Sequence, residues 1–178
     1  MIHTKSRIND FVIDPAGSYA YSAEITHCSE DGLHCKGYVV EYAVKHNGSL
    51  QKIGRTASIR DFGGLAIDPK DRFIYLSSNE GHNRVAAYRI KHDGRPLLIA
   101  KGFPGIYSVN NMAMDPAGKH LYLSDDISIL DMYPPNSQWE KTSVYTSATI
   151  QPNGMISVMG VCAIGAGHGP SSAATTPY

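Results

Sequence analysis

Acidic, imidazole and guanidinium side chains occur close together in variable segments of the sequence. Glu80 lies two residues before His82, and Glu24 and His27 occupy a comparable place earlier in the chain. A carboxylate beside an imidazole can act as a general base and the group that orients it. Arg60 lies in a separate segment, where its guanidinium could hold a carboxylate or a phosphate bidentately. The alternative is that all five are solvated charges on exposed loops.

A second set of polar residues precedes apolar runs of the sequence. Asp10 begins one such run, and Asn110 and Asn111 begin another. The amides of the two asparagines can donate hydrogen bonds to a carbonyl oxygen as charge develops on it. We expect all three residues to bind a substrate. The alternative is that they are polar groups bonded to neighbouring backbone or water.

No motif for a cofactor or a structural metal occurs in the chain. There is neither a Gly-x-Ser-x-Gly elbow nor a Gly-x-x-x-x-Gly-Lys phosphate loop, so we expect no cofactor and no metal. Asp125 and Asp126 could still bind a hard cation together with an asparagine, or could form a charged loop. Trp139 could stack on a sugar ring or pack on a neighbouring sheet. Cys28 and Cys35 could be bonded or free.

The elements that position these residues are set by a phrase that occurs three times. It begins Asp-Pro and ends at a tyrosine, in residues 14–21, 68–75 and 115–122. Proline presets φ at the second turn position, and Gly or Asp tolerates the tight exit, so each phrase predicts a β-hairpin. A second hairpin, with Asn-Gly or Asp-Gly at its turn, follows each phrase.

Each repeat therefore predicts four strands, and a four-stranded repeat of roughly 50 residues is typical of a propeller blade. We predict an all-β fold without helices, made of three four-stranded antiparallel β-propeller blades, which is a partial propeller. The partial propeller is expected in residues 1–160, with a flexible C-terminal tail in 161–178, because the tail is rich in Gly, Ala, Ser, Thr and Pro. The blades are expected at about residues 7–54, 62–102 and 109–160.

Tyr21, Tyr75 and Tyr122 hold the same place in the three repeats, which favours packing between blades over ligand contact. We expect Tyr75 to have a neighbour on each side and Tyr21 to lie beside an open flank. The tight turns share one face of the predicted blades. The variable connections, which include residues 24–37 and 125–143, share the other face, where we expect the site.

The Asp-Pro-x-Gly turn, the tyrosine seven residues after the Asp, and the Tyr-x-Ile/Val-x-x-Asn/Asp-Gly phrase together resemble the lactonase-type β-propeller family. That family includes 6-phosphogluconolactonases and carboxy-muconate cyclase-like enzymes, and its members have seven blades. The resemblance implies hydrolysis of a sugar-acid or muconate-type lactone, and a histidine near one inner strand start. The starts at 8–10, 62–64 and 109–111 contain no His, so that residue is not carried over. The alternative is a non-catalytic propeller that binds a protein or a small molecule.

Bulk properties limit the partners. The 178 residues are 42% hydrophobic and have a formal net charge of zero, which argues against a nucleic-acid partner. No apolar stretch approaches the ~18 residues that span a bilayer, so we expect no membrane partner. The first twenty residues contain no apolar leader core, so we expect either a cytoplasmic protein or a numbering that begins after a removed segment. Three blades cannot close a ring, so we expect self-association or pairing with missing blades.

Overall fold

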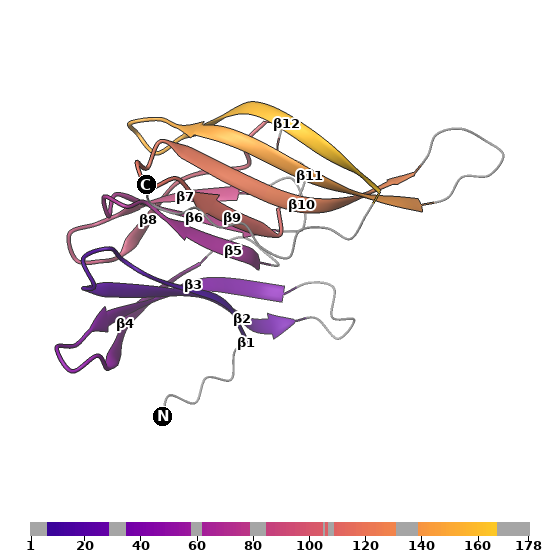
Figure 1. Ribbon diagram of the computed structural model, residues 1–178. Helices are drawn as coiled ribbons and strands as arrows, with labels where there is room; N and C mark the ends of the chain where they lie inside the picture. Colours follow the sequence, from indigo (N-terminus) through magenta and orange to yellow (C-terminus); the bar gives the residue numbers. More distant parts are fainter. Residues whose placement is uncertain are drawn as a thin grey trace.

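The computed structural model describes residues 7–28, 35–57, 62–78, 85–104, 106, 109–130 and 139–166. Within these ranges the chain forms three four-stranded antiparallel sheets and no helix (Figure 1), which confirms the predicted all-β fold of partial propeller blades. The described part contains no helix long and apolar enough to cross a membrane.

Each sheet is one blade, in which strands adjacent in sequence are paired in order. Blade 1 contains β1 (Arg7–Ile13), β2 (Tyr19–Cys28), β3 (Cys35–Val44) and β4 (Leu50–Ala57). Blade 2 contains β5 (Phe62–Ile67), β6 (Phe73–Ser78), β7 (Val85–Ile90) and β8 (Pro96–Lys101). Blade 3 contains β9 (Asn111–Met114), β10 (His120–Leu130), β11 (Trp139–Ile150) and β12 (Ile156–Ala166). The three sheets are stacked, with blade 2 between the other two (Figure 1).

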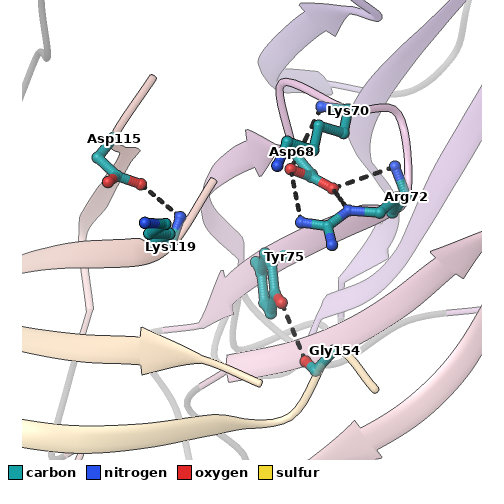
Figure 2. Close-up of polar contacts among 7 residues, drawn as sticks. All are labelled: Asp68, Lys70, Arg72, Tyr75, Asp115, Lys119 and Gly154. Carbon is teal, nitrogen blue, oxygen red and sulfur yellow. Dashed lines mark hydrogen bonds and ion pairs between the residues drawn. The ribbon is translucent and has the colours of Figure 1, made fainter. Parts of the chain in front are cut away.

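The aspartates of the Asp-Pro phrases hold the first turn of each blade, and Figure 2 shows two of them, Asp68 and Asp115. The side chain of Asp115 accepts the backbone N–H of Lys119 at 2.6 Å and that of His120 at 2.9 Å. Asp68 accepts the backbone N–H groups of Lys70 and Arg72, and the Arg72 guanidinium lies 2.5 Å from its carboxylate. These carboxylates satisfy turn amides that would otherwise lack partners, so their role is structural.

Apolar side chains fill the two layers between blades. The layer between blades 1 and 2 includes Val39, Leu65 and Leu76, all of them buried. The layer between blades 2 and 3 includes Val85, Leu123 and further apolar residues of both sheets. The period-two alternation of these strands presents one set of side chains to each neighbouring blade, so each sheet is buried wherever it has a neighbour.

The repeated tyrosines connect one blade to the next. Tyr75 is fully buried and donates its hydroxyl to the carbonyl of Gly154 in blade 3 at 3.0 Å (Figure 2). Tyr21 is also fully buried, and its hydroxyl donates to the carbonyl of Gly94 in blade 2 at 2.9 Å. The expectation that Tyr21 lies beside an open flank is therefore wrong, because the tyrosine position faces the following blade. Tyr122, which has no following blade in the described chain, is 40% exposed.

Three predicted boundaries are wrong. In the connection predicted at 24–37, β2 continues to Cys28 and β3 begins at Cys35. In the connection predicted at 125–143, β10 continues to Leu130 and β11 begins at Trp139 opposite it. The predicted tail at 161–178 begins too early, since β12 continues to Ala166 and pairs with β11 there. Small Gly and Ala residues hide the strand alternation in 161–166, whereas backbone pairing does not depend on side-chain size.

Candidate functional site

The first strands of the three blades lie next to one another, and their starting residues converge on Gly63 and Gly64. Contacts between blades are found for β1 with β5 and for β5 with β9. We call the residues at this convergence the inner-strand cluster, and it consists of Asp10, Gly63, Gly64, Ser77, Asn110, Asn111 and Ser124. Three of the six site residues predicted from the sequence, namely Asp10, Asn110 and Asn111, thus lie at one place in the fold.

Asp10 links blade 1 to blade 2. One oxygen of its carboxylate accepts the backbone N–H of Leu65 at 2.6 Å, and the other accepts the N–H of Phe11 at 2.7 Å. A β-carbon placed on Gly64 would lie 3.3 Å from the Asp10 carboxylate and 3.7 Å from the carbonyl oxygen of Asn110. Asp10 and the Asn110 backbone therefore both lie against Gly64, and the carboxylate is held in one orientation.

Gly63 allows the backbone of β5 to approach the chain that leads into β9. A β-carbon at this position would lie 2.6 Å from the carbonyl oxygens of Val109 and Asn110, and it would also overlap the hydroxyl of Ser77. Contacts that short do not occur in real structures, so a side chain cannot be accommodated without movement of the backbone. The absence of side chains at Gly63 and Gly64 therefore lets the polar groups of blades 1 and 3 lie close to the backbone of β5.

Two serines complete the cluster, and sequence reasoning missed both. The hydroxyl of Ser77 accepts the backbone N–H of Gly64 at 2.6 Å. Ser124, at the same place in blade 3, is 1% exposed, and its hydroxyl has no hydrogen-bond partner within the described part of the chain. A signal was present in the sequence, since both serines follow the repeated tyrosine by two positions. A buried hydroxyl without a partner costs about 1–3 kcal/mol, so we expect a partner for it beyond the described ranges or in a bound molecule.

The charged half of the predicted site falls outside the described residues. This applies to Glu80, His82 and Arg60. Asp125, Asp126 and Trp139 belong to strands of blade 3, but their side chains also lie outside the described part. Among the described residues, no group of three or more His, Cys, Asp or Glu side chains could hold a metal ion.

Glu24 is not the exposed loop residue that its sequence context indicates. It lies within β2, is 2% exposed, and accepts hydrogen bonds from the hydroxyls of Ser22 and Tyr42, both at 2.8 Å. The strand continues past Ala23, so its alternation places Glu24 on the same side of the sheet as these two donors. Burial, and secondarily the hydrogen bond to Glu24, raise the pKa of Tyr42.

A second buried carboxyl, which the sequence analysis did not single out, lies between blades 1 and 2. Glu41 is 1% exposed and accepts the hydroxyl of Thr56 at 2.6 Å. Burial raises the pKa of this carboxyl. The hydrogen bond from Thr56 and the charge of Arg95 offset part of that increase. A β-carbon on Gly54 would overlap Glu41, so the carboxyl fills the space that this glycine leaves. Its neighbours are those of a packed layer rather than of an open site.

Two hollows elsewhere on the described surface have a volume of about 270 Å³ each. One lies on the outer side of blade 3, against Tyr122, Tyr145 and Cys162. The other lies on the side of the tight turns, against Arg72, Phe73 and Arg89. Neither hollow includes a residue of the inner-strand cluster, so neither changes the choice of candidate site.

The stacked four-stranded sheets and their Asp-Pro turns define a lactonase-type β-propeller fold, and the comparison with solved structures supports that class. No protein-family model and no curated protein matches the sequence. A proposed 6-phosphogluconolactonase from Bacteroides uniformis has a TM-score of 0.63 at 17% identity, over 88% of this chain. The periplasmic gluconolactonase PpgL of Pseudomonas aeruginosa has a TM-score of 0.56 at 11% identity, over 90% of this chain.

A proposed 6-phosphogluconolactonase from Bacteroides fragilis is similar at a TM-score of 0.55 and 13% identity, over 89% of this chain. The chain spans 41%, 55% and 58% of the length of these three proteins, in the order given. At such identities the likeness establishes the fold. The reaction must be argued from the residues of the site.

Proposed function

We propose that the protein hydrolyses a lactone of the sugar-acid or muconate type at the inner-strand cluster. The observation that carries this proposal is the fixed Asp10 carboxylate beside the side-chain-free backbone of Gly63 and Gly64. Each carboxylate oxygen retains a lone pair after accepting its backbone N–H, and so can accept a substrate hydroxyl. Ser124, whose backbone carbonyl accepts the N–H of Asn110 at 2.9 Å, adds a buried hydroxyl without a described partner.

In the proposed reaction, water adds to the lactone carbonyl and the ring C–O bond then breaks. Glu80 or His82 accepts the proton of the attacking water and later returns it to the departing alkoxide, so the product is a hydroxy acid. The side-chain amides of Asn110 and Asn111 donate hydrogen bonds to the oxyanion that forms at the carbonyl. Arg60 holds a carboxylate or a phosphate of the substrate, and Asp10 orients its hydroxyl groups.

A second candidate is a non-catalytic module that binds a small molecule or a protein at the same place. The observation that favours it is the absence of histidine from all three inner strand starts, where the resemblance implies one. The two candidates share the binding surface and differ only in turnover, so a test of binding and a test of turnover separate them.

Binding at the cluster is tested by titrating the ¹⁵N-labelled protein with gluconolactam, in which a ring nitrogen replaces the lactone ring oxygen and prevents ready hydrolysis. We expect shifts of the amide resonances of Leu65 and Asn110, because the lactam would contact their strands. The amides of Asp71 and Arg89, on the side of the tight turns, should not move. Shifts confined to that side, or no shifts at millimolar lactam, would remove the inner-strand cluster as a binding site for sugar-acid lactones.

A further inference from the structure

The two interfaces between blades repeat the same contact. The tyrosine of the second strand donates its hydroxyl to the carbonyl of a glycine in the last turn of the following blade, from Tyr21 to Gly94 and from Tyr75 to Gly154. The residue two positions before the tyrosine packs on the same glycine. A β-carbon at Gly154 would lie 2.6 Å from the Phe73 ring, and one at Gly94 would overlap the Tyr19 ring. The last turn of each blade is therefore the part that the tyrosine of the preceding blade contacts.

The Asp-Pro turns form a second contact that also repeats. A β-carbon on Gly118 of blade 3 would overlap the Asp68 carboxylate of blade 2. Asp71 takes the place of Gly118 in blade 2, has a φ of 55°, and lies near Asp14 of blade 1. Burial and the charge of Asp14 raise the pKa of Asp71, as expected for two carboxylates facing each other across the interface. Each turn therefore abuts the aspartate of the preceding blade.

The outer flank of blade 3 carries the tyrosine side of these contacts, and no following blade of the described chain covers it. Tyr122 is 40% exposed, whereas Tyr21 and Tyr75 are fully buried at the same position. Val161 and Met159 of the last strand are also exposed, at 49% and 62%. The 270 Å³ hollow against Tyr122 lies where the following blade covers the equivalent surface in blades 1 and 2.

The outer flank of blade 1 carries the other side of these contacts, which is made of turn glycines. No atom lies within 4 Å of a β-carbon placed on Gly48 or Gly17, although their equivalents in blades 2 and 3 are in close contact. Phe11 and Ile13 of β1 are 40% and 51% exposed, whereas Leu65, which matches Phe11, is 4% exposed. This flank therefore offers the open turn glycines and the apolar strand residues that a preceding blade covers elsewhere.

We propose that a second copy of this chain occupies both flanks, with blade 3 of one copy packed on blade 1 of the other. In this arrangement the hydroxyl of Tyr122 donates to the carbonyl of Gly48, and Gly17 lies against Asp115, as in the two internal interfaces. Both halves of the contact are present on one chain, so two identical head-to-tail contacts close a ring of six blades. Six lies within the usual range of four to eight blades.

Sedimentation velocity of the wild-type protein tests this proposal, and we expect a species of twice the 19.3 kDa chain mass. Ile13→Lys and Tyr122→Lys each place a charge on one flank, so each variant should sediment as a monomer. Leu97→Lys is the matched control, because Leu97 is as exposed as Ile13, at 51%, but lies on the last strand of the central blade. Far-UV circular dichroism checks that all three variants fold.

A mixture of the two flank variants tests whether blade 3 of one copy packs on blade 1 of the other. The Ile13→Lys chain retains an intact blade 3 flank and the Tyr122→Lys chain an intact blade 1 flank, so one contact per pair survives and dimers should return. A monomeric wild type would overturn the proposal, and so would a mixture that remains monomeric at the highest soluble concentration. A ladder of larger species in the wild type would overturn the closed ring.

Discussion

Replacing Tyr75 with alanine should lower the free energy of unfolding by about 3–5 kcal/mol, the usual cost of removing a large buried aromatic side chain. The Tyr75 ring is fully buried between blades 2 and 3, and its hydroxyl satisfies the carbonyl of Gly154. The substitution therefore leaves a cavity and a buried carbonyl without its donor. Urea denaturation of Tyr75→Ala and wild type measures the difference, and Tyr75→Phe isolates the hydroxyl at about 1 kcal/mol.

Tyr122→Ala is the matched control for Tyr75→Ala, because the two tyrosines hold equivalent positions and differ in exposure. It should cost less than about 1 kcal/mol in the Ile13→Lys background, where the flank of blade 3 stays uncovered. Similar losses for Tyr75→Ala and Tyr122→Ala in that background would mean that the tyrosine position does not face the following blade. Burial raises the pKa of Tyr75 well above its usual range, so this hydroxyl remains a donor throughout ordinary assay conditions.

Glu80→Gln should lower kcat by about 10²–10⁴-fold if Glu80 is the group that accepts the proton of water, the usual effect of removing a positioned base. Glutamine keeps the size of the side chain and cannot accept the proton. Lys70→Ala is the control, since Lys70 is exposed in an Asp-Pro turn on the other face. Initial rates of lactone opening give kcat and KM for wild type and both variants.

Equal kcat values for Glu80→Gln and Lys70→Ala would exclude Glu80 as the base and leave His82→Asn as the next variant. A raised KM with unchanged kcat in Glu80→Gln would indicate that Glu80 contributes to substrate binding alone. Either result bears on which residue of the variable connections accepts the proton. A loss of activity in Lys70→Ala would instead bring into question whether the site lies on the face that the variable connections share.

The sequence was sufficient to predict the blades because their turns depend on local chemistry. Asp68 and Asp115 bond to amides within five residues of themselves, and such contacts follow from Asp-Pro and Gly spacing. The strand ends of blade 3 could not be predicted in the same way. Small residues in 161–166 and the charges Asp125 and Asp126 carry no alternation signal, whereas the backbone of β11 continues to pair with both neighbouring strands.

The sequence predicts the convergence of polar residues at the inner-strand cluster only in part, for a different physical reason. Asp10 lies within the first strand of blade 1 and Asn110 directly before that of blade 3, and the first strands of adjacent blades meet, so their convergence follows from the repeat. The bond from the N–H of Leu65 to Asp10 links residues 55 positions apart, and no local pattern reports it. Glu24 was misplaced for a similar reason, because its partner Tyr42 comes from the next strand.

The most direct test of the proposed function is the initial rate of ring opening of glucono-, 6-phosphoglucono- and muconate-type lactones by the wild-type protein. The rates are compared with spontaneous opening in the same buffer. We predict saturable acceleration with at least one of these lactones, together with inhibition by gluconolactam. If no lactone opens faster than its spontaneous rate while gluconolactam still shifts the amides of Leu65 and Asn110, the enzyme proposal is contradicted and the cluster is a binding site.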